Sequence, residues 1–175
     1  LGQEFSGYAA QLAQGERHLR AALPHLCELA IGGTAVGTGL NAPPGYAQKC
    51  VDHLAAITGF PNHLAENLIE ATQNTQAFVL YSGCMKSLAI KLSKICSDLR
   101  LLSSGPRAGL GEIQLPPRQP GSSIMPGKVN PVIPEVVNQV AYRVIGNDLA
   151  VALAAEAGQL QLNVMEPVIA ACILE

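Results

Sequence analysis

The chain has 175 residues and a net charge of −2, and it is 49% hydrophobic although only 4% of it is aromatic and 14% is charged. A sequence pI of about 6.1, without a basic block, argues against nucleic acid as a partner. No apolar run approaches the roughly 20 residues that cross a bilayer, so the sequence predicts no membrane span. The low charged fraction instead predicts helices that are buried on more than one side, as in a bundle shared between subunits.

The cysteines are odd in number and far apart, and none of them forms a C-x-x-C pair that would suggest a zinc or redox site. No basic segment with a cleavage site marks a signal peptide at the N-terminal end. We therefore expect reduced thiols, packed as small apolar groups in a cytoplasmic protein. The five residues are Cys27, Cys50, Cys84, Cys96 and Cys172.

The first part of the chain is predicted to be helical, with one interruption by proline. Apolar side chains in residues 2–31 fall mostly three, four or seven apart, which predicts a long helix. Pro24 lies inside this pattern and predicts a kink or a tightened turn. The glycines and prolines of residues 32–44 favour a tight connection between helices over a ligand-binding loop. Further helices are expected at residues 45–58 and from about residue 64 onward.

Residues 76–102 show the clearest helical pattern of the chain, with an apolar stripe at three- and four-residue spacing. Lys94 and Asp98 are placed to pair one turn apart. The polar segment 70–76, which precedes this helix, is either the polar side of a helix or a set of amide groups near a site. The stripe consists of Leu88, Leu92, Ile95, Leu99 and Leu102.

Helical periodicity stops after Leu102, because the glycines and prolines of residues 103–120 exclude a regular helix or strand. A helix is predicted again at residues 134–155, with a bend or a close helix crossing at Gly146-Asn147-Asp148. Alternation at residues 159–164 predicts a short extended connection, after which a helix resumes near Pro167. These elements predict an all-α fold, a bundle of long helices.

The loop at residues 121–130, Gly-Ser-Ser-Ile-Met-Pro-Gly-Lys-Val-Asn, is suited to hold an anion. Its two glycines permit turns in which consecutive backbone N–H groups point at one ligand. Lys128 supplies a full charge and Asn130 a neutral donor, a reasonable pair for one carboxylate. A Gly- and Ser-containing surface loop is the alternative that composition alone leaves open.

The other end of this loop carries Ser122 and Ser123 beside backbone N–H groups. When a base removes the proton next to a carboxylate, negative charge moves onto the carboxylate oxygens, and oriented N–H groups and hydroxyls stabilise that charge. A serine can be this base only if nearby donors stabilise its alkoxide. The loop contains such donors, so it is compatible with an elimination from a small dicarboxylate.

Four separated segments resemble the aspartase/fumarase superfamily of anti-eliminating lyases. The loop signature is highly specific, and the likeness extends along the whole chain. It implies that residues 1–175 are a fragment of the central helical domain, which carries the oligomerisation surface and the active-site loop, without the N-terminal and C-terminal domains. The four segments are residues 1–8, 33–41, 103–109 and 121–130.

Within the superfamily, residues 156–167 resemble the aspartate ammonia-lyase branch, as do residues 70–75 and 134–138. Fumarases tend to carry a Phe-Glu-Leu-Asn-Val-Phe type of sequence at residues 160–165, where this chain differs. The resemblance therefore favours elimination of ammonia from L-aspartate to give fumarate through an enediolate. A fumarate hydratase and a non-catalytic helical oligomerisation module remain as alternatives.

The resemblance also implies roles for single residues and the partners of the site. The substrate is a small dicarboxylate, and neither a metal nor an organic cofactor is required. The sites are shared between the subunits of a homotetramer, so the fragment alone is expected to be inactive. The implied residues are Ser122 as the base, Ser123, Ile124 and Met125 around the carboxylate that becomes the enediolate, Lys128 and Asn130 on the other carboxylate, and Glu135 as the holder of a histidine from another segment.

Overall fold

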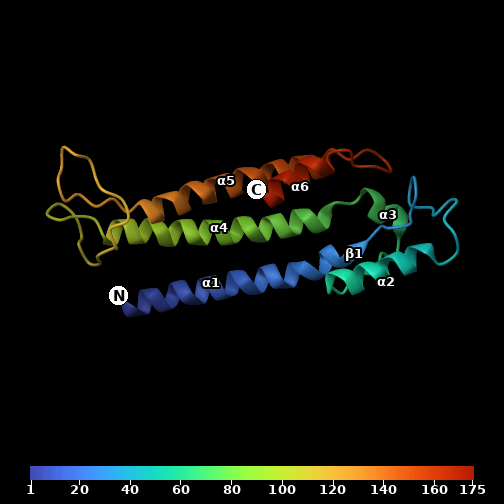
Figure 1. Cartoon of the computed structure of the whole chain (residues 1–175), viewed down its shortest axis with the longest axis horizontal. Coiled ribbons are helices and arrows are strands. Elements are labelled where there is room, and N and C mark those ends of the chain that lie inside the picture. The colour runs from blue at the N-terminus through green and yellow to red at the C-terminus, as the bar shows by residue number, and fades with distance from the viewer. The chain divides into compact units, whose positions relative to one another are not determined.

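The structure, a computed structural model, describes residues 1–175. Its regular elements are helices apart from two short strands, which confirms the all-α class (Figure 1). None of these helices is long and apolar enough to cross a membrane. The helices are α1 (Gly2–Ala22), α2 (Tyr46–Thr58), α3 (Leu68–Gln73), α4 (Gln76–Leu102), α5 (Val132–Glu156) and α6 (Glu166–Leu174), with a 3-10 helix at Leu23–Cys27.

The chain divides into two compact units, each made of segments that are distant in sequence. The first unit contains residues 1–15 and 86–146, and the second contains residues 16–85 and 147–175. The helices α1, α4 and α5 contribute residues to both units. Within the first unit, α4 and α5 run side by side, and the connection between them forms loops beyond their ends (Figure 1).

A tyrosine links α1 to α4 in the first unit. Tyr8 is 5% exposed, and its hydroxyl donates to a carboxylate oxygen of Asp98 at 2.6 Å. The same oxygen accepts from Lys94 one turn away, which confirms the predicted Lys94–Asp98 pair. The hydrogen bond from Lys94, followed by that from Tyr8, lowers the pKa of Asp98, and the bond to Asp98 raises the pKa of Tyr8.

The second unit has a small apolar core between α5 and α6. Val151, Ala154 and Ile169 are its buried members, and Val79 of α4 packs against them. Because α6 has only nine residues, this burial and not helix propensity stabilises it.

A two-stranded parallel sheet also lies in the second unit, between β1 (Glu28–Leu29) and β2 (His63–Leu64). The prediction of one helix over residues 2–31 was wrong after Ala22. Pro24 has no N–H for the helical ladder, so the chain tightens into the 3-10 helix, as the tightened-turn alternative predicted, and then enters β1. The prediction of a helix from about residue 64 was wrong at its start, because Leu64 pairs in β2 and α3 begins only at Leu68.

Residues just before α3 explain its late start. The side chain of Asn67 caps the helix by accepting from the N–H groups of Ile69 at 3.1 Å and Glu70 at 3.2 Å. In the connection at residues 32–44, Gly37 lies so close to the backbone of Ile69 that a Cβ on Gly37 would collide with it. This close approach supports the prediction of a tight connection at residues 32–44.

The later helices follow the sequence more closely. The helix at residues 76–102 is confirmed at both ends, and α5 begins two residues before the predicted start. At Asn147 the helix continues without a break, and the buried amide donates to the carbonyl oxygen of Cys172 in α6 at 3.1 Å. This contact supports the helix-crossing alternative over the bend.

The predicted extended connection at residues 159–164 was wrong. Gln159 and Leu162 exchange backbone hydrogen bonds of 2.9 and 3.2 Å across a tight turn, in which Leu160 has a φ of 52°. Asn163, 6% exposed, donates to the carbonyl oxygen of Ala154 at 3.0 Å. This bond satisfies a carbonyl group at the C-terminal end of α5. The sequence shows only an alternation of apolar and polar residues over six positions, which is too short to distinguish a strand from a turn.

Candidate functional site

The connection between α4 and α5 folds back over the C-terminal end of α4. The N–H of Glu112 donates to the carbonyl oxygen of Leu102 at 2.9 Å, which satisfies one of the carbonyl groups left open at a helix end. The hydroxyl of Ser104 donates to the carbonyl oxygen of Leu101 at 2.6 Å and accepts from the N–H of Leu110 at 3.1 Å. As predicted, the segment contains no helix, and these bonds order it.

The 121–130 loop closes on itself like a small hairpin. Pro120 and Val129 form an isolated antiparallel bridge at its base. Gly121 packs directly against Lys128, and a Cβ at this position would collide with the Lys128 carbonyl oxygen. Gly127 has a φ of 81°, which disfavours residues with a side chain. The two glycines are therefore required by the shape of the loop, as the sequence suggested.

Backbone donors of the loop point at Ser122. The N–H of Ile124 donates to the Ser122 hydroxyl oxygen at 3.3 Å, and the N–H of Met125 donates to the Ser122 carbonyl oxygen at 3.0 Å. The side chain of Ile124 is 86% exposed. The donors predicted beside the serines are present, and in this conformation they bond to Ser122.

Two hollows meet at this loop. The first, here called the loop hollow, has a volume of about 550 Å³ and is lined by residues 117–123 and 125–129. The second, here called the helix-end hollow, has a volume of about 510 Å³ and lies where α4 ends and α5 begins. Its polar lining consists of Arg100, Ser103, Ser104, Gln114, Lys128, Asn130 and Glu135.

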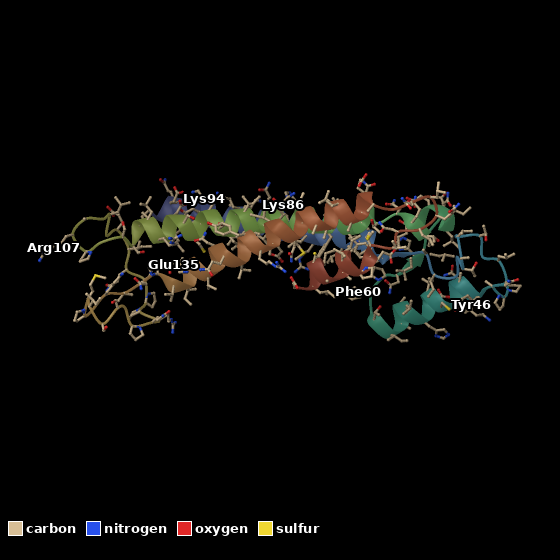
Figure 2. The ribbon with its side chains drawn as sticks, turned by 90° about the horizontal axis from the view of Figure 1, so that it is seen from above. Tyr46, Phe60, Lys86, Lys94, Arg107 and Glu135 are labelled. Atoms are coloured by element: carbon tan, nitrogen blue, oxygen red, sulfur yellow. The ribbon has the colours of Figure 1, made fainter.

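The predicted site residues divide between these hollows. Ser122, Ser123 and Met125 line the loop hollow, and Asn130 and Glu135 line the helix-end hollow. Figure 2 shows Glu135 near the start of α5, next to the loops. Lys128 lines both hollows, whereas Ile124 lines neither. An anion bridging the two hollows would lie between serine hydroxyls and the lysine.

Sequence reasoning missed one cation of the helix-end hollow, Arg100. Its guanidinium Nη1 donates to the side-chain oxygen of Asn138 at 3.2 Å, a bond that joins α4 to α5. In the sequence, Arg100 is one basic residue at the end of a long helix, where a basic residue is common for electrostatic reasons alone. Only the fold brings it to the wall that contains Lys128.

A third polar hollow, here called the acidic hollow, lies in the second unit and has a volume of about 380 Å³. Glu28 and Glu70 line it together with His25, Asn74 and Gln76. Asn74 and Gln76 of segment 70–76 thus line a hollow, whereas Gln73 does not, and the Asn74 side chain bonds to Glu70 and to the N–H of Gln76. No group of three or more His, Cys, Asp or Glu residues is arranged to hold a metal ion.

Comparison with known proteins gives a consistent result. The sequence model of a family described as lyase matches residues 1–146. The aspartate ammonia-lyase of Pseudomonas aeruginosa is 66% identical over 171 residues, which are 97% of this chain and 36% of that protein. The aspartate ammonia-lyase of Escherichia coli (strain K12) is 58% identical over 175 residues, 100% of this chain and 37% of that protein.

Solved structures agree in fold. A crystal structure described as fumarate lyase:delta crystallin from Brucella melitensis, bound to cobalt, has a TM-score of 0.96 at 57% identity over 99% of this chain and 38% of that one. A class II fumarase from Schistosoma mansoni has a TM-score of 0.91 at 41% identity, covering 99% of this chain and 40% of that one. The chain therefore spans less than half the length of the proteins that it matches.

Proposed function

This chain belongs to the lyase family, and from that premise we propose that it forms part of an aspartate ammonia-lyase, which converts L-aspartate reversibly to fumarate and ammonia. The observation that carries the proposal is the high overall identity to relatives of that name, in a match that spans the whole chain. The arrangement of the loop agrees with it, because hydroxyls, backbone donors and a lysine surround space for a small dianion.

Ser122 is the proposed base. Its alkoxide removes a proton from Cβ of aspartate, and the electron pair of the C–H bond moves onto the adjacent carboxylate to give an enediolate. Collapse of the enediolate forms the carbon–carbon double bond and expels the α-ammonium group as ammonia, with the electron pair of the C–N bond. The N–H of Ile124, which donates to the Ser122 oxygen, is placed to stabilise the alkoxide.

The two carboxylates of the substrate have different partners in this proposal. Ser123 and the N–H groups of Ile124 and Met125 hold the carboxylate that becomes the enediolate. These two N–H groups bond to Ser122 in the present conformation, so the substrate carboxylate would have to replace the Met125 bond and share the Ile124 N–H with the Ser122 oxygen. Lys128 and Asn130 hold the other carboxylate.

Glu135 is proposed to orient a histidine from another segment, and that requirement points to an assembled enzyme. We infer that the chain is the central helical domain of a cytoplasmic homotetramer and is inactive by itself. The apolar surface of α5 supports assembly, because many large side chains on it are exposed in the single chain. They include Ile133, Val136, Val140, Tyr142, Leu149 and Leu153.

The test is an absorbance assay for fumarate, with the intact enzyme that contains this chain and with aspartate and malate as alternative substrates. Turnover of aspartate alone supports the proposal. Turnover of malate alone would make the protein a fumarate hydratase, the second candidate, which the likeness to the class II fumarase favours. An assembled protein that acts on neither would be the non-catalytic module. Residues 1–175 alone are expected to form no fumarate.

A further inference from the structure

The side chain of Arg100 occupies a defined position at the helix-end hollow. It lies in the last turn of α4 and lines this hollow together with Lys128, Asn130 and Glu135. Its Nη1 donates to the Asn138 side-chain oxygen at 3.2 Å. Both residues belong to the first unit, so the arrangement lies within one compact body.

Asn138 is a rigid anchor for this guanidinium. It is 2% exposed, and its Nδ2 donates to the carbonyl oxygen of Ser93 at 2.8 Å, to the Ser93 hydroxyl at 2.8 Å and to the Ser97 hydroxyl at 3.3 Å. With its nitrogen held by α4, its oxygen can face only one way. Since a buried amide that loses its partners is costly, this orientation is strongly preferred.

The charge of Arg100 is not neutralised by a partner in the chain. The guanidinium forms no ion pair with any carboxylate, and its one hydrogen bond to a side chain goes to a neutral amide. The remaining donors of its planar fork match the geometry of a carboxylate. Lys128 adds a second positive charge to the same wall, against the single carboxylate of Glu135.

We propose that Arg100, held by Asn138, binds the substrate carboxylate that Lys128 and Asn130 also hold, and so selects substrates that have this second carboxylate. Resting on the proposed function, this assigns to the carboxylate at Lys128 and Asn130 a further cationic partner from the end of α4. Arg100 then discriminates a dianion from a monoanion of the same length. The residue binds substrate and takes no part in the proton transfer.

The experiment measures binding of two ligands by titration calorimetry to the intact enzyme that contains this chain. Succinate carries two carboxylates, and butyrate has the same number of carbons but only one. The variants are Arg100→Gln, which removes the charge, Arg100→Lys, which keeps it, and Arg107→Gln. Arg107 is an exposed arginine of the same connection that lines neither hollow, and Figure 2 shows it at the outer end of the loops, away from Glu135.

We expect Arg100→Gln to weaken succinate binding about tenfold or more, the usual effect of losing a charge-assisted hydrogen bond, and to change butyrate binding little. Arg100→Lys should recover most of the affinity, and Arg107→Gln should bind as the wild type does. In steady-state assays, Arg100→Gln should raise KM for aspartate more than it lowers kcat.

Two results would overturn the assignment. The first is an Arg100→Gln variant that binds succinate with the wild-type affinity. The second is an Arg100→Gln variant that loses the same factor of affinity for succinate and for butyrate and has a lower Tm, which would indicate a structural role only. If the wild-type enzyme binds succinate but does not convert aspartate, the proposed function fails while the role of Arg100 is still decided. If it does not bind succinate, the assignment of Arg100 fails, and the fumarate assay decides the proposed function separately.

Discussion

The helix-end hollow of the first unit and the acidic hollow of the second unit are similar in kind and opposite in charge. Both are open, polar and of comparable volume, about 510 and 380 Å³. The former has Arg100 and Lys128 in its wall against the carboxylate of Glu135. The latter has the carboxylates of Glu28 and Glu70, with His25 as its basic residue.

This difference shows that size and polarity alone do not identify the site of a dicarboxylate. A doubly negative ligand is attracted by two fixed cations and repelled by two carboxylates, and a low-dielectric wall strengthens both effects. The cationic hollow also shares Lys128 with the loop that contains the serines, whereas the acidic hollow has no serine in its lining. The charge and the adjacent Ser122, the proposed base, together favour the first unit.

The largest expected effect is on chemistry at the loop. In the intact enzyme, Ser122→Ala should lower kcat by roughly 10²- to 10⁴-fold, the usual contribution of a positioned base, while assembly is unchanged. Fumarate absorbance and sedimentation measure the two quantities. Ser87→Ala on α4, outside both hollows of the first unit, is the control and should be fully active. A kcat near the wild-type value in Ser122→Ala would exclude this serine as the base.

The next effect tests the charge difference directly. Lys128→Gln should raise KM for aspartate by about 10- to 100-fold, because a charge-assisted bond to a carboxylate is lost. The matched change in the acidic hollow, Glu70→Gln, should leave KM within about twofold. Steady-state kinetics at constant ionic strength measure KM for both variants. If Glu70→Gln changes KM as much as Lys128→Gln does, the comparison between the hollows is wrong.

Two buried asparagines allow a comparison of stability. Asn138→Ala and Asn163→Ala should each destabilise the protein by about 1–3 kcal/mol, because each leaves buried polar groups without partners. Only Asn138→Ala should also raise KM, since only Asn138 holds Arg100. Thermal unfolding and kinetics measured on the same samples separate the two effects. An equal KM for both variants would argue against positioning by Asn138.

The smallest effect concerns the Tyr8–Asp98 link, away from the hollows. The pKa of Asp98 is lowered in the folded state, so its carboxylate stabilises the fold above its ordinary pKa of 3.8, and this contribution is lost as the pH falls through the lowered value. Asp98→Asn should lower Tm by about 1–3 °C at pH 7 and by progressively less below pH 3.8. Glu16→Gln, in an exposed pair with Arg20, should change Tm little. A pH-independent difference for Asp98→Asn would contradict the linkage.

The sequence predicted elements well where the pattern was long. The helix predicted at about residues 76–102 carries an apolar stripe from Leu88 to Leu102, about four turns long, and α4 has the predicted ends. The predictions were wrong at residues 28–29, at Leu64 and at residues 159–164, where the structure has a two-stranded sheet and a turn. Segments of two to six residues carry too little periodicity, and their partners are distant in sequence.

The candidate site divides in the same way. The loop signature of residues 121–130 is contiguous, so its glycines, serines and lysine could be recognised along the chain. Arg100 could not be recognised in this way, because it lies 21 residues before Gly121 and belongs to a helix with several other basic side chains. The hydrogen bond to Asn138, which lies on a different helix, distinguishes Arg100 from the other basic residues of α4.

By itself, the sequence determined the all-α class, the long helices, the lyase family and an anion-holding loop, since each of these depends on local pattern or on contiguous residues. The tertiary structure decided which charges face each hollow, because that depends on which distant segments of the chain line the same hollow. It placed Arg100 and Lys128 in one wall and Glu28 and Glu70 in another. The composition of the chain alone does not determine how its charged side chains are distributed between the two hollows.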